Sequence, residues 1–210
     1  MLPYQPFEFG APEFQKETGI SDEVLRRFQD YAEIIAKWNQ LVGLVGDSTL
    51  PIIWHRHFMD SAQLLPLLPK NPGRIADLGS GAGFPGLVLA LMGVKNIVLF
   101  ERNIRKAEFL QRTNRELNAG AEIINLTSED YTEEPFDVLL SRAAAPLDEL
   151  LYASRRLRKP STICLFQKGK NLDAEMREAQ KEWVMPDARR IPSLTDAQAS
   201  ILRLVDVVAV

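Results

Sequence analysis

The sequence predicts an α/β domain whose mostly parallel sheet is covered by helices on both faces. From about residue 74 onward, short apolar runs typical of strands alternate with amphipathic segments typical of helices. In addition, residues 74–86, RIADLGSGAGFPG, have the pattern of a buried strand, a glycine-rich turn and the start of a helix. A chain of 210 residues with 46% hydrophobic and 25% charged residues has the composition of one ordinary globular domain. We therefore expect a core domain over residues 73–210, with residues 1–72 as a mainly helical extension.

Composition also limits the functional class. No apolar run approaches the roughly 20 residues of a membrane span, and no basic-then-apolar leader opens the chain. The single cysteine excludes an internal disulfide and favours a cytoplasmic protein. The net charge of −3 gives no general nucleic-acid signal, so RNA binding would depend on local patches. We expect no membrane partner and favour a monomer.

The first elements differ in regularity. Residues 1–20 are rich in proline and phenylalanine, which predicts an irregular segment on the surface. Ser21 is a suitable N-cap, with acidic residues directly after it that complement the helix dipole. Apolar residues then recur at helical spacing up to Val42, which predicts a helix packed on the α/β domain. The alternative is that its aromatic stripe binds a partner.

Both histidines lie in the segment 54–61, WHRHFMDS. A zinc site is not expected, because the only cysteine is remote and metal sites recruit three or four ligands. Two interpretations remain: a capped, charged helical segment, or a functional Arg56–His57 pair close to the ligand site of the core. Prolines at 66, 69 and 72 then predict a stiff connection into the first strand of the core.

The remaining core elements follow from the same patterns. The predicted strands cover residues 75–78, 96–100, 121–126, 136–140, 162–166 and 201–208. The predicted helices begin near Pro85, which suits a first helical turn, and then cover residues 105–117, 148–157 and 173–183.

The glycine turn points to a nucleotide-like ligand. Gly81, Gly83 and Gly86 fit the dinucleotide pattern, and Glu101 follows Gly81 by 20 residues. Asp77 argues against a dinucleotide, because its carboxylate would repel a pyrophosphate. The same carboxylate would favour the ammonium and sulfonium groups of S-adenosylmethionine, while Glu101 could accept the two ribose hydroxyls. The pattern favours a methyltransferase over a nicotinamide-binding oxidoreductase, which stays open as an alternative.

Further motifs make the chain resemble a narrower family, the bacterial 16S rRNA guanine-N7 methyltransferases, or glucose-inhibited division protein B family. The resemblance extends from about Val24 to the C-terminus. Its motifs are Lys37-Trp38-Asn39, Arg56-His57-Phe58-Met59-Asp60-Ser61, the Asp77–Gly86 loop, Ser141-Arg142-Ala143 and Lys168-Gly169. The chain departs from the family pattern at Gly43-Leu44-Val45, Thr127 and Ala199-Ser200.

The resemblance implies a class I S-adenosylmethionine-dependent methyltransferase fold. This fold has a Rossmann-like, mostly parallel seven-stranded sheet with a final antiparallel hairpin strand, and here an N-terminal helical extension. It implies that Gly79 and Phe84 contact the cofactor, that Ser128 and Glu129 lie beside adenine, and that Arg142 lies where cofactor and acceptor meet. Together with the residue pattern, the expected cofactor site is Asp77, Gly79, Gly81, Phe84, Glu101, Ser128, Glu129 and Arg142. The implied partner is 16S rRNA, in the small ribosomal subunit or its precursor, and the product is S-adenosylhomocysteine.

The chemistry of the acceptor agrees with guanine N7. The only cysteine lies in an apolar strand, and an amine methyltransferase would carry an Asn-Pro-Pro-like box where this chain has Ser141-Arg142-Ala143-Ala144. Guanine N7 has an exposed lone pair and no proton, so Arg142 is expected to position groups and no general base is needed. A methyltransferase of another acceptor stays possible. The expected RNA contacts, with a solvated basic face as the alternative, are Arg56, His57, Arg155, Arg156 and Lys168.

Overall fold

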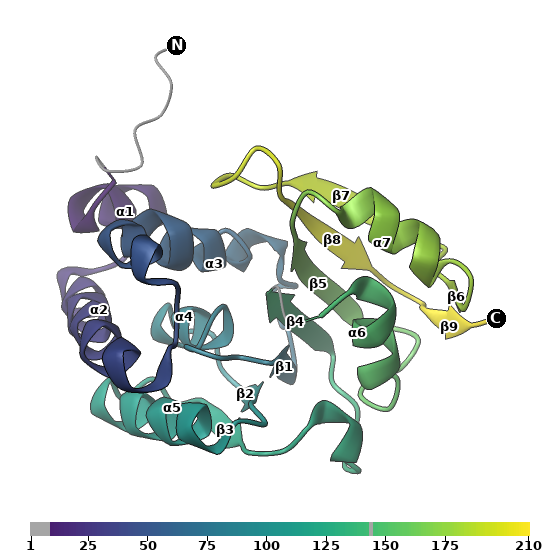
Figure 1. Cartoon of the computed structure of the whole chain (residues 1–210), viewed down its shortest axis with the longest axis horizontal. Coiled ribbons are helices and arrows are strands. Elements are labelled where there is room, and N and C mark those ends of the chain that lie inside the picture. Colours follow the sequence, from purple (N-terminus) through teal and green to yellow (C-terminus); the bar gives the residue numbers. More distant parts are fainter. Residues whose placement is uncertain (1–8, 143–144) are drawn as a thin grey trace.

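A twisted sheet runs through the centre of the protein, and the computed structural model describes residues 9–142 and 145–210 (Figure 1). In spatial order its strands are β3 (Glu122–Ile124), β2 (Ile97–Phe100), β1 (Ile75–Leu78), β4 (Val138–Arg142), β5 (Ile163–Lys168), β8 (Ser200–Leu204) and β7 (Arg189–Pro192). β1 to β5 are parallel, whereas β8 is antiparallel to both of its neighbours. This confirms the predicted seven-stranded, mostly parallel sheet with an antiparallel final strand.

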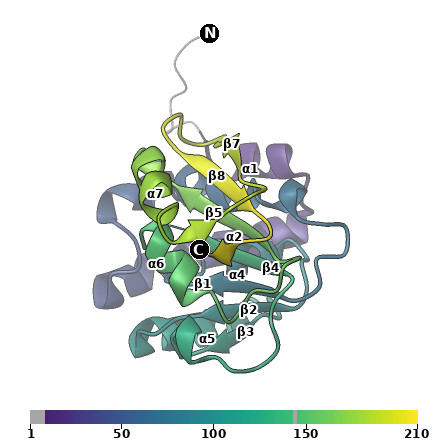
Figure 2. The same ribbon diagram turned by 90° about the vertical axis from the view of Figure 1, so that its right-hand side faces the viewer.

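Helices cover both faces of the sheet, which is seen from a second direction in Figure 2. Side chains of alternate strand residues point to opposite faces and enter two separate apolar clusters. One cluster packs the sheet against α4 (Gly86–Leu91), α5 (Ile104–Glu116) and the N-terminal helices. The other packs it against α6 (Leu147–Ala153) and α7 (Leu172–Ala179). Burial on both faces explains why the central strands are almost continuously apolar.

The N-terminal extension begins with two helices, α1 (Ala11–Thr18) and α2 (Asp22–Val42). The predicted N-cap of α2 is confirmed, because Ser21 Oγ accepts a hydrogen bond from the Val24 N–H at 3.3 Å. The prediction of an irregular segment up to residue 20 was wrong where α1 forms, and residues 1–8 lie outside the described part. The Glu13 carboxylate accepts the Gly10 N–H at 2.9 Å, a local cap that starts α1, and Pro12 suits the first turn because no N–H is needed there.

The segment between α2 and β1 is built from short, tight helical turns. They are η2 (Asp47–Ile52), the π-helical turn η3 (Trp54–Met59), α3 (Asp60–Ala62) and η4 (Leu65–Leu67). Residues 54–61 are helical, as one of their two interpretations expected, but no described side chain caps them and the first part is π-helical. Such turns are rare and often mark functional sites.

The C-terminal third differs most from the sequence pattern. α7 ends at Ala179, and Trp183 belongs to the short strand β6 (Trp183–Val184), which pairs with β9 (Val208–Ala209). The strand predicted over residues 201–208 therefore splits into β8 and β9. β7 was not predicted from local pattern, because most of its residues are exposed or half-exposed. Within the described ranges, no helix has both the length and the apolar character needed to cross a membrane.

Candidate active site

The loops after β1 to β4 enclose a cleft of about 610 Å³, which we call the first cleft. It lies at the carboxyl ends of the parallel strands, where α/β sheets bind their ligands. The residues that line it include nearly all of those predicted to bind the cofactor, namely Gly79, Gly81, Phe84, Glu101, Ser128, Glu129 and Arg142. Asp77 is the exception.

The loop after β1 is folded by its glycines. Gly79, Gly81 and Gly83 have φ values of 70°, 56° and 93°, in the left-handed region that other residues rarely adopt. Gly86 is required for a different reason: a Cβ there would lie 2.8 Å from Asp77 Oδ2. The glycines therefore let the backbone turn sharply and leave room for the buried carboxylate.

Asp77 lies beneath this loop and is completely buried. Its Oδ2 accepts the Gly86 N–H at 2.9 Å, whereas Oδ1 has no hydrogen-bond partner among the residues that the structure describes. Burial raises the pKa of Asp77 to about 6, against the opposing effects of the Gly86 and Ser80 hydrogen bonds. The structure thus gives Asp77 a second role that the sequence did not suggest, which is to tie the start of α4 to the end of β1.

Glu101 follows β2 and lines the first cleft directly. Its Oε2 accepts the Gly81 N–H at 2.9 Å, and its Oε1 accepts the Asn103 N–H at 2.7 Å. Each carboxylate oxygen has a further lone pair, so Glu101 can hold the glycine loop and still accept hydroxyl groups of a ligand.

We expect Glu101→Ala to weaken binding of S-adenosylhomocysteine by about 1–3 kcal/mol, the range for hydrogen bonds to a charged group. The substitution would remove the carboxylate that is expected to accept the ligand's hydroxyl groups and that accepts the Gly81 N–H. Isothermal titration calorimetry measures the change, with the exposed Glu108→Ala on α5 as the control. An affinity that Glu101→Ala leaves unchanged would remove Glu101 from the site.

A second cleft of about 330 Å³ lies beside the first. Arg142, at the end of β4, lines both clefts and so separates them. The second cleft is otherwise lined by residues from distant parts of the chain, which include Thr49, Arg56, His57, Asp60, Gln167, Lys168, Ser193 and Asp196.

The guanidinium of Arg142 is held on several sides. Nη1 donates to Asp60 Oδ2 and to the Arg56 carbonyl oxygen, both at 3.3 Å, and Nη2 contacts His57 Nδ1 at 2.9 Å. The guanidinium carbon lies 4.6 Å from the centre of the Phe84 ring. Burial lowers the pKa of Arg142, but an arginine keeps its proton in proteins. The side chain is thus a fixed positive charge between the clefts.

These contacts also define the tautomer of His57. Because arginine can only donate, Nδ1 of His57 must accept, so the ring proton is on Nε2 and is donated to Thr49 Oγ1 at 2.8 Å. Burial and the two neighbouring arginines lower the pKa of His57 to about 3. The neutral ring stacks on Phe84, with 4.9 Å between ring centres and an interplanar angle of 11°. The Arg56–His57 pair predicted near the ligand site is therefore brought to it, His57 as a neutral support and Arg56 at the rim.

The other predicted basic contacts are placed differently. Lys168 lines the second cleft, but its side chain is buried and forms a 2.5 Å ion pair with Glu175. Arg155 and Arg156 follow α6 and line neither cleft, although Ala153, at the end of α6, lines the first. The structure therefore does not bring Arg155 and Arg156 to either cleft, and their predicted RNA contacts gain no support from its geometry.

Sequence reasoning also missed several residues of both clefts. Lys106 and Leu126 line the first cleft, and Thr49 and Gln167 line the second. Asp60 could have been found, because it belongs to the same motif as Arg56 and His57. The departures from the family pattern also fall at the clefts: Leu44 and Thr127 line the first, and Ala199 and Ser200 line the second.

Comparison with solved structures supports the fold. The chain superposes on a glycopeptide N-methyltransferase solved with S-adenosylhomocysteine, with a TM-score of 0.60 over 71% of this chain and 89% of the other, at 8% identity. It also superposes on magnesium protoporphyrin IX methyltransferase from Synechocystis PCC 6803, solved with bound S-adenosylmethionine, with a TM-score of 0.58 over 89% of this chain and 97% of the other, at 14% identity. This likeness confirms the predicted class I methyltransferase fold.

Comparison of sequences identifies the family. Residues 24–202 match the GidB family, described as rRNA small subunit methyltransferase G. A ribosomal RNA small subunit methyltransferase G from Rhodospirillum centenum is 42% identical over 95% of this chain and 92% of its own length. The resemblance seen in the motifs is thereby confirmed, and the oxidoreductase alternative has no support. The chain belongs to the rRNA small subunit methyltransferase G family.

Proposed function

We propose that the protein methylates N7 of a guanine in 16S rRNA, with S-adenosylmethionine as the donor and S-adenosylhomocysteine as the product. The observation that carries the proposal is the position of Arg142 between two clefts, one suited to the donor and the other to a base. The proposed setting is the cytoplasm, with the small ribosomal subunit or its precursor as the partner and the enzyme acting as a monomer.

The residues of the first cleft fit S-adenosylmethionine. Glu101 offers acceptors for ribose hydroxyls, while Leu126 and Phe84 supply apolar surface for a nucleoside. Asp77 does not line the cleft, but its carboxylate lies buried directly beneath the loop. Its Oδ1 lacks a hydrogen-bond partner among the described residues, so its negative charge favours a cation in the cleft above it, such as the ligand's ammonium. When bound, S-adenosylmethionine supplies an activated methyl group.

The second cleft fits the acceptor base. Arg142 presents forked donors that can engage guanine O6 or a phosphate and leave N7 free to face the first cleft. The residues that could serve as bases at this point are already engaged, since His57 Nδ1 and Asp60 Oδ2 both contact Arg142. Attack by N7 needs no proton removal, so the task of the protein is to align donor and acceptor. Arg56 is half-exposed at the rim and pairs with Asp196 at 3.3 Å, and we expect it to contact the RNA backbone.

Incubation with purified ribosomal subunits and a labelled donor tests the substrate class. The subunits come from a bacterial strain that lacks this methyltransferase, and small and large subunits are assayed separately. We expect label only in 16S rRNA, because its folded structure can present a guanine to the second cleft. Label in large-subunit RNA, in protein, or in neither subunit would contradict the proposal and favour another acceptor.

A further inference from the structure

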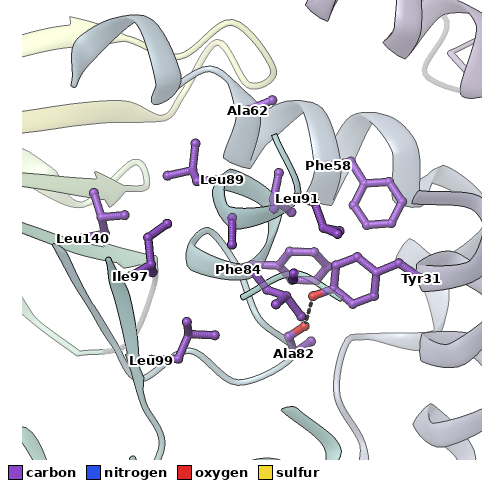
Figure 3. Close-up of a cluster of buried hydrophobic side chains, with 14 of the residues drawn as sticks. Tyr31, Phe58, Ala62, Ala82, Phe84, Leu89, Leu91, Ile97, Leu99 and Leu140 are labelled. Atoms are coloured by element: carbon purple, nitrogen blue, oxygen red, sulfur yellow. Dashed lines mark hydrogen bonds between the residues drawn. The ribbon is translucent and has the colours of Figure 1, made fainter. Parts of the chain in front are cut away.

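The loop that lines the first cleft is held from behind by a residue of the N-terminal extension (Figure 3). Tyr31, on α2, is completely buried, and its hydroxyl donates a hydrogen bond to the carbonyl oxygen of Ala82. Ala82 belongs to the glycine loop and lines the first cleft. The contact joins two residues that are 51 positions apart in the sequence. It is therefore a tertiary contact, which no local sequence pattern could have predicted.

The loop and Tyr31 are fitted closely to each other. Gly83, the residue after Ala82, has a φ of +93°, and a Cβ at that position would collide with the Tyr31 hydroxyl. The same Cβ would lie 2.9 Å from Leu87 Cβ, on the helix that follows. The hydroxyl thus takes the space that a side chain at position 83 would need. The backbone at Ala82–Gly83 is fixed by a hydrogen bond on one side and by packing on the other.

Tyr31 also supports the aromatic residue at the end of the loop. Its ring stacks on Phe58, with 5.4 Å between ring centres, and lies 5.9 Å from the ring of Phe84. Phe84 lines the first cleft and in turn supports His57 and Arg142. Figure 3 shows Tyr31, Phe84 and Ala82 side by side within the buried cluster. One side chain of α2 therefore contacts the cofactor loop at two points.

We infer that Tyr31 is a positioning residue for S-adenosylmethionine: its hydroxyl holds the Ala82–Gly83 backbone in the shape that receives the cofactor. The N-terminal helix α2 then forms part of the cofactor site, although it contributes no residue predicted to contact the ligand. Pre-organisation of this kind raises affinity because the loop need not be ordered upon binding. Burial raises the pKa of Tyr31 well above its usual value, so the hydroxyl keeps its proton and can donate at any pH used for assays. The inference concerns cofactor affinity and holds whichever RNA nucleotide accepts the methyl group.

The test is Tyr31→Phe, which removes the hydroxyl and keeps the ring. We expect calorimetry to show an affinity for S-adenosylhomocysteine lowered about 3- to 10-fold, the range for one hydrogen bond. In a methyl-transfer assay, KM for S-adenosylmethionine should rise while kcat at saturating donor stays unchanged. Without ligand, amide hydrogens of residues 79–84 and of Gly86 should exchange faster than in the wild-type protein, because the loop opens more often.

Tyr131→Phe is the matched control. Tyr131 is also buried, but its hydroxyl bonds to Arg74 and Glu133, and its ring packs in the cluster on the opposite face of the sheet. We expect this variant to melt at a lower temperature and to keep the wild-type affinity for S-adenosylhomocysteine.

Two results would overturn the inference. One is a folded Tyr31→Phe protein with unchanged affinity for S-adenosylhomocysteine, or with a loss that Tyr131→Phe reproduces. The other is a wild-type protein whose loop amides at residues 82–84 exchange without protection when no ligand is bound. The calorimetry and the hydrogen-exchange measurements that decide the inference are made without RNA, so a failure of the proposed rRNA activity would not be mistaken for a failure of this inference.

Discussion

Replacement of Arg142 with lysine is expected to lower methyl transfer to 16S rRNA roughly 100-fold, the scale for loss of a preorganised charged donor at an active site. Lysine keeps the positive charge but cannot contact Asp60, the Arg56 carbonyl and His57 with one planar fork. It also loses the flat contact with Phe84. Folding should be nearly normal, because Arg142 lines the clefts rather than the apolar core. Affinity for S-adenosylhomocysteine should change by less than the turnover does.

Arg155→Lys is the matched control for Arg142→Lys. Arg155 also lies over an aromatic ring, with its guanidinium carbon 3.8 Å from the centre of the Tyr152 ring, and also donates to a carbonyl oxygen. It lines neither cleft, so its replacement should leave methyl transfer unchanged. Near-normal turnover in a folded Arg142→Lys protein would remove Arg142 from the active site. A comparable loss in Arg155→Lys would restore the basic cluster after α6 as an RNA contact.

Replacement of Asp77 with alanine is expected to weaken cofactor binding by about 100-fold, as loss of a hydrogen bond to a charged group in a buried site. The Gly86 N–H would lose its acceptor, and the negative charge beneath the loop would disappear. Asp77→Asn keeps an oxygen acceptor for Gly86 but not the charge, so an intermediate affinity is expected. Calorimetry with S-adenosylhomocysteine measures both, and Asp137→Asn at the opposite edge of the sheet serves as the control. If both Asp77 variants bound S-adenosylhomocysteine with wild-type affinity, Asp77 would have no role in cofactor binding.

Because the pKa of Asp77 is raised to about 6, the charge of its carboxyl group changes within the pH range of a binding assay. Below this pH the carboxyl is protonated and no longer favours the ligand's ammonium. Affinity of the wild-type protein for S-adenosylhomocysteine should therefore fall as pH decreases through about 6 and level off above it. Asp77→Asn should lack this dependence, since the amide does not titrate in this range.

The parts of the fold that sequence predicts are those with local causes. The cofactor loop could be recognised because Gly79, Gly81 and Gly83 must adopt positive φ values directly after a buried strand. α2 could be recognised because its N-cap, Ser21, and the helical spacing of its apolar residues both lie within one continuous stretch of sequence. β7 and β9 could not, because their pairing with β8 and β6 is decided by partners elsewhere in the chain.

The two clefts also differ in how far the sequence predicts them. The first cleft follows from one rule, that the carboxyl ends of parallel strands meet at one edge of the sheet. The second cleft depends on tertiary contacts such as that between Arg142 and the segment 56–60, more than 80 positions earlier. Charge in the sequence does not by itself place a residue at a cleft. Lys168 forms an ion pair with Glu175, and Arg155 packs on Tyr152 and lines neither cleft, although both belong to basic stretches of the sequence.

In the proposed reaction the two clefts bring a methyl donor to N7 of a guanine in 16S rRNA, so the decisive measurement identifies the modified atom. Small subunits from the strain that lacks the enzyme are treated with the protein and S-adenosylmethionine, and the 16S rRNA is then reduced with borohydride and cleaved with aniline. N7-methylguanosine is sensitive to this treatment, whereas guanosine methylated at the exocyclic amine is not. We expect a new, enzyme-dependent cleavage at a guanine, absent with Arg142→Lys. A methylated nucleotide found by mass spectrometry without such cleavage would contradict the proposed reaction.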